Sequence, residues 1–228
     1  MKKLFFTFAL FFTASIIFLS CSRDSDYNGN GNENGNGNPS GIGEPTATTD
    51  PGVVINGTRW ATRNVAAPGA FAQHAHDAGM FFQWNRRIGW STTDPMVSSP
   101  AGATWSNTHV TDETWVRTND PCPLGWRMPT LQELQSLGVG NTWVTNWNDT
   151  GVNGSLFGTA PNLLFLPAAG ARLTNGALAY VGNWGHVWSS TQGSSMATAW
   201  GLLFGGGTTL VSGDSARALG LSVRCVAE

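Results

Sequence analysis

Lysine is absent from this sequence after residue 3, and charge of either sign is scarce throughout. Only 11% of the 228 residues are Asp, Glu, Lys or Arg, less than half of the roughly 25% usual in soluble domains. The formal net charge is −2, and no basic cluster occurs. These absences argue against nucleic-acid binding, which needs many cations to neutralise phosphates.

Catalytic motifs are absent as well. The sequence contains no Gly-x-Ser-x-Gly elbow, P-loop, His-Glu-x-x-His pair or dinucleotide-binding glycine motif. No segment supplies a nucleophile, a base and an oxyanion donor together. We therefore expect no enzymatic activity and no cofactor.

The four histidines do not indicate a metal site. His74 and His76 stand two residues apart with Asp77 beside them, a spacing that suits metal ligands in an extended segment. No third His lies nearby, and the surrounding Ala, Gly and Gln indicate a loop, so we predict no metal there. His109 and His186 are isolated, and we interpret them as packing or binding-surface residues.

The tripeptide Trp147-Asn148-Asp149 is one that C-type lectins use to hold calcium. It stands alone here, well before the final predicted strands and without a partner motif. We interpret it as a turn.

The N-terminus resembles a lipoprotein signal. Lys2 and Lys3 precede an apolar run of 16 residues, and the small residue Ser20 stands before Cys21. A membrane-spanning helix is the alternative, but it would need ~20 apolar residues. We predict a signal peptide over residues 1–20 and lipidation of Cys21, since several acyl chains give stable anchoring. Ser22-Arg23-Asp24-Ser25-Asp26 resembles the acidic start of lipoproteins that Bacteroidetes export to the outer surface. This resemblance implies a lipid-anchored protein of the outer membrane, exposed at the cell surface.

A spacer follows the anchor. Residues 28–44 hold six Asn and six Gly, a composition that buries too little surface to become ordered. We assign residues 21–52 to anchor and flexible tether, and residues 53–228 to one globular domain. This domain has nine Arg and nine Asp or Glu, so it is neutral.

Cysteine is scarce too, and only Cys122 and Cys225 remain for the domain. Two cysteines in an exported domain most simply form one disulfide. A redox or metal pair is the alternative, but neither residue has a second Cys or a His at ligand spacing.

The predicted elements are short. Residues 53–55 and 58–60 read as a hairpin around Asn56-Gly57, and Thr130 and Glu133 indicate a capped helix that ends at Gly138. Long loops are expected at 86–119 and 138–160, and further strands at 81–84, 163–166, 187–188, 199–204 and 220–226. The fold class is α+β, with a small antiparallel sheet, one or two helices and long loops.

Tryptophan is abundant, with 11 residues, and we expect the core to include Trp60, Trp84, Trp126, Trp188 and Trp200. Period-two alternation places Trp200, Leu202 and Phe204 on a core face, and Gly201, Leu203 and Gly205 on the other. Three arginines are expected to be structural, bonding loop carbonyls or pairing with acids such as Asp120 and Glu133: Arg127, Arg172 and Arg224.

Several longer strings resemble one family. They are VVINGTRWATRNV, GMFFQWNRR, DPCPLGWRMPTLQELQSL, FLPAAGARL, GHVWSSTQ and GLSVRCV. Together they resemble the Fibrobacter succinogenes major paralogous domain, exported and often carried on bacterial lipoproteins. The resemblance covers roughly residues 53–228 and implies a C-type-lectin-like fold, related to that of formylglycine-generating enzymes. It also implies that Cys122 and Cys225 pair.

Residues 184–226 resemble the variable region of targets of diversity-generating retroelements, with Ala199 to Phe204 as part of the fixed frame. The alternative is an ordinary hairpin turn at 205–209. The resemblance implies a ligand-binding face on the 193–219 segment together with the 86–119 loop. Its candidate contacts are Trp184, His186, Gly201, Leu203, Gly205, Thr209, Ser212 and Leu219.

These observations predict a surface-anchored binding module for an unknown glycan or protein, used in adhesion or recognition. The alternative is a structural pilus-tip or cell-envelope component without a small ligand. An enzyme of the formylglycine-generating type is a third hypothesis, but it needs a reactive thiol pair that a disulfide would consume.

Overall fold

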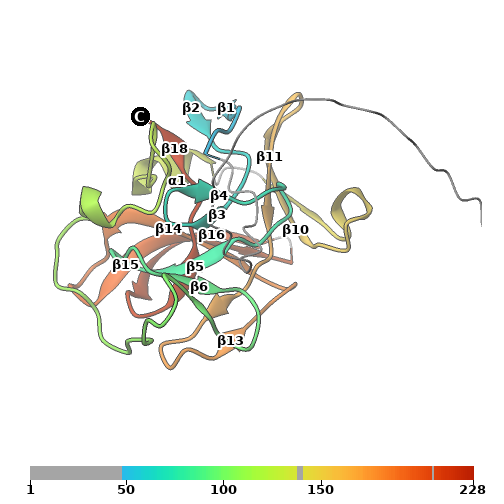
Figure 1. The fold of residues 1–228 in the computed structure, drawn as a ribbon. Helices are drawn as coiled ribbons and strands as arrows, with labels where there is room; N and C mark the ends of the chain where they lie inside the picture. The colour runs from blue at the N-terminus through green and yellow to red at the C-terminus, as the bar shows by residue number, and fades with distance from the viewer. Residues whose placement is uncertain (1–47, 138–140, 207) are drawn as a thin grey trace, which may run out of the picture. The chain divides into compact units, whose positions relative to one another are not determined.

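The computed structural model describes residues 48–137, 141–206 and 208–228, without the side chains of residues 209–213. The predicted signal peptide, Cys21, most of the tether and Gly138 lie outside the described residues. The described part is largely β-structure with one α-helix (Figure 1). None of its helices is long and apolar enough to cross a membrane.

The predicted N-terminal hairpin is confirmed. Strand β1 (Val53–Ile55) pairs antiparallel with β2 (Thr58–Trp60), and Asn56 and Gly57 have φ of 49° and 83°, as the tight turn requires. The C-terminal strand β18 (Val226–Ala227) lies between β2 and β8 (Trp126–Arg127) in the same sheet. Figure 1 shows the C-terminus beside this hairpin, so the sheet ties the two ends of the domain together.

A nine-stranded sheet forms the centre of the domain. Its pairs are antiparallel except for the parallel pair β14–β17, and its main path runs β16-β15-β14-β17-β5-β6-β7. Two further strands, β12 and β13, branch from β17. In chain order the strands are β5 (Met80–Gln83), β6 (Gly89–Ser91), β7 (Ser98–Ser99), β12 (Ala171–Arg172), β13 (Leu178–Ala179), β14 (Gly185–Gln192), β15 (Thr198–Gly205), β16 (Thr208–Ala216) and β17 (Gly220–Ser222). The sequence predicts a smaller sheet because most of these strands have only two to four residues.

The predictions of long loops at 86–119 and 138–160 are each wrong in part. The first range contains β6 and β7, and the second contains two strands, one near each end. Strands β9 (Asn141–Val144), β10 (Gly154–Thr159) and β11 (Asn162–Pro167) form a three-stranded antiparallel sheet. Strand β10 is hard to predict because glycine is uncommon in strands. At Gly154 an added Cβ would stand 2.2 Å from the Leu166 carbonyl oxygen, so only glycine fits there. The smaller elements are β3 (Val65–Ala67), β4 (Ala70–Phe71), and the 3₁₀ turns η1 (Arg117–Asn119) and η2 (Trp147–Asp149).

The predicted helix is present as α1 (Leu131–Leu137), and its capping box forms as expected. The Glu133 N–H donates to Thr130 Oγ1 at 3.3 Å, and the Thr130 N–H donates to Glu133 Oε2 at 2.7 Å. Leu134 and Leu137 are buried, in one core cluster with Val187, Leu202 and Phe204 of β14 and β15. The helix therefore covers one face of these two strands.

Four of the five tryptophans predicted for the core are buried: Trp60, Trp84, Trp126 and Trp188. Trp200 is only half-buried, so this prediction is wrong. The pairing of β15 with β16 shifts register between Ala199 and Gly201, and a bulge of this kind breaks the period of two. Ala199 takes the core position instead, and Leu202 and Phe204 are buried as predicted.

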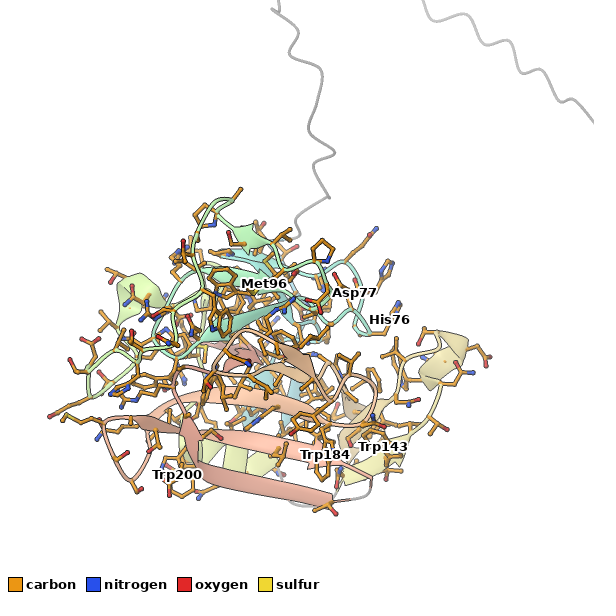
Figure 2. All side chains as sticks on the ribbon, turned by 90° about the horizontal axis from the view of Figure 1, so that it is seen from below. His76, Asp77, Met96, Trp143, Trp184 and Trp200 are labelled. Carbon is orange, nitrogen blue, oxygen red and sulfur yellow. A yellow bond between two sulfur atoms is a disulfide. The ribbon has the colours of Figure 1, made fainter. Side chains whose placement is uncertain are left out.

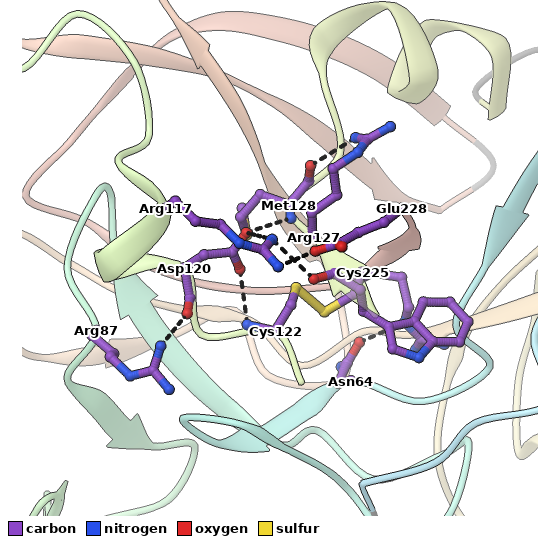
Figure 3. Close-up of a disulfide and its surroundings, with 11 residues drawn as sticks. Asn64, Arg87, Arg117, Asp120, Cys122, Arg127, Met128, Cys225 and Glu228 are labelled. Carbon is purple, nitrogen blue, oxygen red and sulfur yellow. Dashed lines mark hydrogen bonds and ion pairs between the residues drawn. A yellow bond between two sulfur atoms is a disulfide. The ribbon is translucent and has the colours of Figure 1, made fainter. Parts of the chain in front are cut away.

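Cys122 and Cys225 form the predicted disulfide, with an S–S distance of 2.06 Å. It joins the middle of the chain to its end (Figure 3). Beside it, the buried Asp120 carboxylate accepts hydrogen bonds from the backbone N–H groups of Cys122 and Met128, at 2.9 and 3.0 Å. Burial is the largest influence on Asp120 and raises the pKa of its carboxyl group.

The three arginines predicted to be structural bind carbonyls, acids and an amide. Arg127 forms two hydrogen bonds with the Glu133 carboxylate, at 2.9 and 2.6 Å. Arg172 contacts Asp94 and several carbonyls, while Arg224 binds the Asn64 side chain and the Ala61 carbonyl. Asp120 pairs with Arg117 at 3.5 Å, rather than with any of these three.

The folded part reaches back to Asp50. Its buried carboxylate accepts from the Thr62 N–H at 2.9 Å and pairs with Arg63 at 2.9 Å. The three buried clusters and the disulfide all lie within the described residues. This part of the chain therefore has a complete core of its own.

Candidate functional site

Strands β14 and β15 present two faces with different surroundings. His186 lies directly opposite Leu203 in the antiparallel register, and Val187 lies opposite Leu202. Val187 and Leu202 point toward the cluster that α1 covers. His186 and Leu203 therefore point the other way, and both are half-buried.

A pocket of about 370 Å³ opens where His186 and Leu203 lie. Four of the eight predicted contact residues line it, namely Trp184, His186, Leu203 and Leu219. The remaining lining residues are Gly170, Ala171, Leu173 and Tyr180. None of the lining residues is Asp, Glu, Lys or Arg, so the pocket is apolar and aromatic with one imidazole.

Trp184 is fixed by the turn that carries it. Its backbone N–H donates to the Tyr180 carbonyl at 3.0 Å, and its carbonyl accepts from the Gly170 N–H at 2.8 Å. Its indole ring lies over Gly205, where an added Cβ would stand 2.7 Å from the ring. The aromatic wall of the pocket is therefore already in place before any ligand binds.

Gly201 and Gly205, two of the predicted contact residues, do not line the pocket. Both are buried, and a Cβ at Gly201 would stand 2.8 Å from the Val187 carbonyl oxygen and 3.1 Å from His186 Nε2. Their missing side chains make room for His186 and Trp184. Period-two alternation alone cannot show that these glycines make room for larger residues, because it takes no account of the neighbouring strand.

Thr209 and Ser212 are the last two predicted contacts. In the backbone register Thr209 lies opposite Phe204, and Ser212 lies opposite Gly201. Their side chains lie outside the described part of the structure. The strand β16 on which they stand pairs antiparallel with β15, with Gly205 opposite Thr208. This is the hairpin that the sequence offers as the alternative to a variable face.

Burial sets the protonation state of His186. It lowers the pKa of the imidazole from 6.5 to about 4, so the ring is neutral near pH 7. His186 Nε2 lies 3.3 Å from Ser215 Oγ, within hydrogen-bonding distance. A neutral ring held in this way offers a ligand a hydrogen-bonding edge without a charge.

The 86–119 loop does not line this pocket among the described residues, contrary to expectation. Trp105 of this loop packs elsewhere: its indole N–H donates to the Thr174 carbonyl at 2.8 Å, and its ring covers Gly220. The 170–180 segment takes the place of the loop in the pocket wall. The sequence carries a hint of this segment, since Asn175-Gly176 is a hairpin dipeptide, and β12 and β13 pair around it.

Exposed apolar side chains stand beside the pocket. Tyr180 is 59% exposed and Val181 is 52% exposed, in the turn that leads to Trp184. Tyr180 has a positive φ of 63°, which is unusual for a bulky residue. Figure 2 shows Trp184 and Trp200 toward opposite ends of β15, so Trp200 belongs to a separate part of the surface.

A second group of polar side chains lies in the turn at residues 74–77. His74, His76 and Asp77 each offer one donor atom, and these atoms lie within 4.8 Å of one another. The sequence predicts no metal here because the segment reads as a loop. The loop turns back on itself, however, through a hydrogen bond from the Asp77 N–H to the His74 carbonyl at 3.2 Å.

Trp147-Asn148-Asp149 lies in the 3₁₀ turn η2, as predicted. Trp147 stacks on Phe165 with ring centroids 4.3 Å apart.

No protein-family model, curated protein or solved structure matches the chain. The resemblance given by its motifs therefore rests on those motifs alone.

Proposed function

We propose that this chain is a lipid-anchored surface protein whose domain binds a ligand through the pocket between Trp184 and Leu219. The main support is that four predicted contact residues, spread over 36 positions of sequence, line one apolar pocket. Apolar and aromatic pockets with few polar groups are the usual form of a ligand site.

The pocket chemistry favours an uncharged ligand group. No charged side chain lines it, and the one ionisable group, His186, is neutral near pH 7. Burial of apolar area and aromatic contact would supply most of the binding free energy. An apolar side chain of a partner protein, or the apolar face of a sugar, suits such a wall, whereas a charged glycan does not.

The anchor and tether support display at a surface. A lipidated Cys21 would hold the chain to the outer membrane, and the Asn- and Gly-rich spacer would let the domain reach outward. The domain itself has its own core and its own disulfide, which suits an exported module. Because this disulfide joins both domain thiols, it also supports binding over the thiol chemistry of a formylglycine-generating enzyme.

We further infer that the domain belongs to the C-type-lectin-like folds and that residues 184–226 are diversified. One helix, largely antiparallel sheets of mostly short strands and the disulfide from the middle to the end support the first point. Four of the eight residues that line the pocket come from residues 184–226, which supports the second. A side chain at Gly201 or Gly205 would collide with neighbouring atoms. We therefore expect these two positions to stay glycine and residues such as Leu203 to vary.

A screen of the soluble domain against glycan and protein arrays tests the proposal. We expect a ligand whose affinity falls at least tenfold in Trp184→Ala and in Leu203→Asp. Binding should change little with salt, because the pocket lacks charge.

Leu124→Ser is the matched control, because Leu124 is 93% exposed and lies outside the pocket. Circular dichroism would confirm that each variant is folded. A ligand that binds all three variants equally, or no ligand at ~100 µM protein, would count against the proposal.

A further inference from the structure

The turn at residues 74–77 carries a cluster that the pocket does not use. His74 Nδ1 lies 3.4 Å from Asp77 Oδ2, and His76 Nε2 lies 3.6 Å from Asp77 Oδ1. Zinc binds His nitrogen at about 2.0–2.1 Å and carboxylate oxygen at about 2.0–2.2 Å, with tetrahedral angles. Two ligands at those distances are separated by about 3.3–3.5 Å. The two observed separations are close to this value.

The Asp77 carboxylate is held in place from within the turn. Its Oδ2 atom accepts a hydrogen bond from the His74 backbone N–H at 2.7 Å. Hydrogen bonds of this kind orient the ligating carboxylates of metal sites. The two imidazole rings lie nearly parallel, with an interplanar angle of 12° and centroids 5.1 Å apart. The three donor atoms already lie within 4.8 Å of one another, and rotation of the two exposed imidazole rings would aim their nitrogens at one ion.

The cluster is accessible and opens onto a cavity. The side chains of His74, His76 and Asp77 are 54%, 30% and 34% exposed. His76 and Asp77 line a pocket of about 370 Å³, whose wall includes Thr92, Thr93 and Asn153. No Arg or Lys lines this pocket, so no fixed cation opposes a metal ion there. The labelled side chains in Figure 2 show His76 and Asp77 at the surface of the domain.

We propose that His74, His76 and Asp77 form a binding site for a divalent transition-metal ion. Two imidazoles and one carboxylate suit zinc, copper or nickel, whereas calcium and magnesium prefer sites made of oxygen alone. Three protein ligands leave one position open in a tetrahedral site, and two of them, His76 and Asp77, line the adjoining pocket. Val181 and Gly182 line this pocket, and the adjoining Tyr180 lines the apolar one, so one turn contributes to both.

Zinc titration of the purified domain, residues 42–228 without a histidine tag, tests this site by calorimetry. We expect one zinc ion per chain, and at least a tenfold loss of affinity in His74→Ala, His76→Ala and Asp77→Asn. The cobalt complex should show the strong visible absorption of a tetrahedral site, and the same substitutions should abolish it. His109→Ala is the control, since His109 is exposed and stands apart from the cluster.

Thermal unfolding gives a second measurement. Zinc should raise the melting temperature of the natural domain and of His109→Ala, but not that of the His74→Ala, His76→Ala double variant. All three changed residues lie at the surface, so the variants should fold. Absence of zinc binding below ~100 µM, or equal affinity in the double variant, would overturn the assignment. The apolar pocket shares no residue with the cluster. The zinc titration and the ligand screen therefore test the two proposals independently.

Discussion

In the apolar pocket, the protonation of His186 and the position of Trp184 depend on the residues next to them. His186 is neutral because it is half-buried beside Gly201, and Trp184 keeps its position because Gly205 has no side chain. A methyl group at either glycine would meet atoms closer than 3.0 Å. Glycine at these two positions therefore decides which larger residues can form the wall.

The protonation of His186 should make stability depend on pH. Its pKa is about 4 in the fold and 6.5 otherwise, so the unfolded chain binds more protons between these values. The stabilisation is complete above pH 6.5 and is lost as the pH falls toward 4. We expect the free energy of unfolding to fall by about 1–3 kcal/mol over this window. Urea unfolding at a series of pH values would measure it.

His186→Gln should remove this part of the pH dependence, whereas His109→Gln at an exposed position should leave it in place. Asp50 and Glu133, whose carboxyl pKa values are lowered, add their own losses at acidic pH in every variant. The difference between variants therefore isolates His186. A slope that persists unchanged in His186→Gln would show that another group causes it.

At the scale of elements, buried arginines hold the long loops to the sheet. The Arg217 guanidinium donates to the carbonyls of Val110 and Asp112 at 3.0 and 2.7 Å, and to the Gln192 side chain at 3.0 Å. It also lies 3.9 Å from the centre of the Trp84 ring. One side chain therefore joins a loop to β14 and to the core, which explains how a domain rich in loops keeps a defined surface.

Replacing Arg217 by Met should release that loop. We expect the free energy of unfolding to fall by about 2–4 kcal/mol, because buried carbonyls lose charged donors. Hydrogen exchange over residues 106–115 should accelerate, while exchange in β10 and β11 should not change. Arg217→Lys keeps the charge but not the planar fork, so its effect should be intermediate. Unchanged exchange in the loop of Arg217→Met would mean that other contacts hold it.

Elements that adjacent residues determine were predicted correctly, whereas elements that depend on a neighbouring strand were not. The β1–β2 hairpin and the capping box of α1 were predictable because a few adjacent residues determine them. Strand β10 was not, because its glycines are required by the neighbouring β11. Trp200 was misplaced for a similar reason: the bulge depends on how β15 pairs with β16.

At the scale of the whole domain, the main question is how its first and last strands are held together. The strand β18 pairs with β2 and β8, and the disulfide joins Cys122 to Cys225 across 103 positions of sequence. A crosslink over so long a loop restricts the unfolded chain strongly. The neutral, loop-rich domain therefore depends on covalent closure as well as on its tryptophan core.

Removing the disulfide should destabilise the domain considerably. In the chain-entropy model, the Cys122→Ala, Cys225→Ala double variant loses about 4–5 kcal/mol of unfolding free energy. Chemical unfolding of the natural and variant domains would measure the difference. Changing both residues avoids leaving a free thiol, and a loss below ~1 kcal/mol would contradict the chain-entropy account.

The sequence by itself determined the features that rest on composition and on short motifs. These are the neutral charge of the domain, the two-cysteine pairing and most of the tryptophan core. The lipid anchor and the tether rest on the sequence as well, and they stay predictions. Tertiary structure decided which residues meet. Residues of the 170–180 segment, rather than of 86–119, line the pocket. Gly201 and Gly205 make room for neighbouring side chains, and His74, His76 and Asp77 lie close together in one turn. Composition and periodicity act along the chain, whereas a site depends on strand register and turns that bring distant residues into contact.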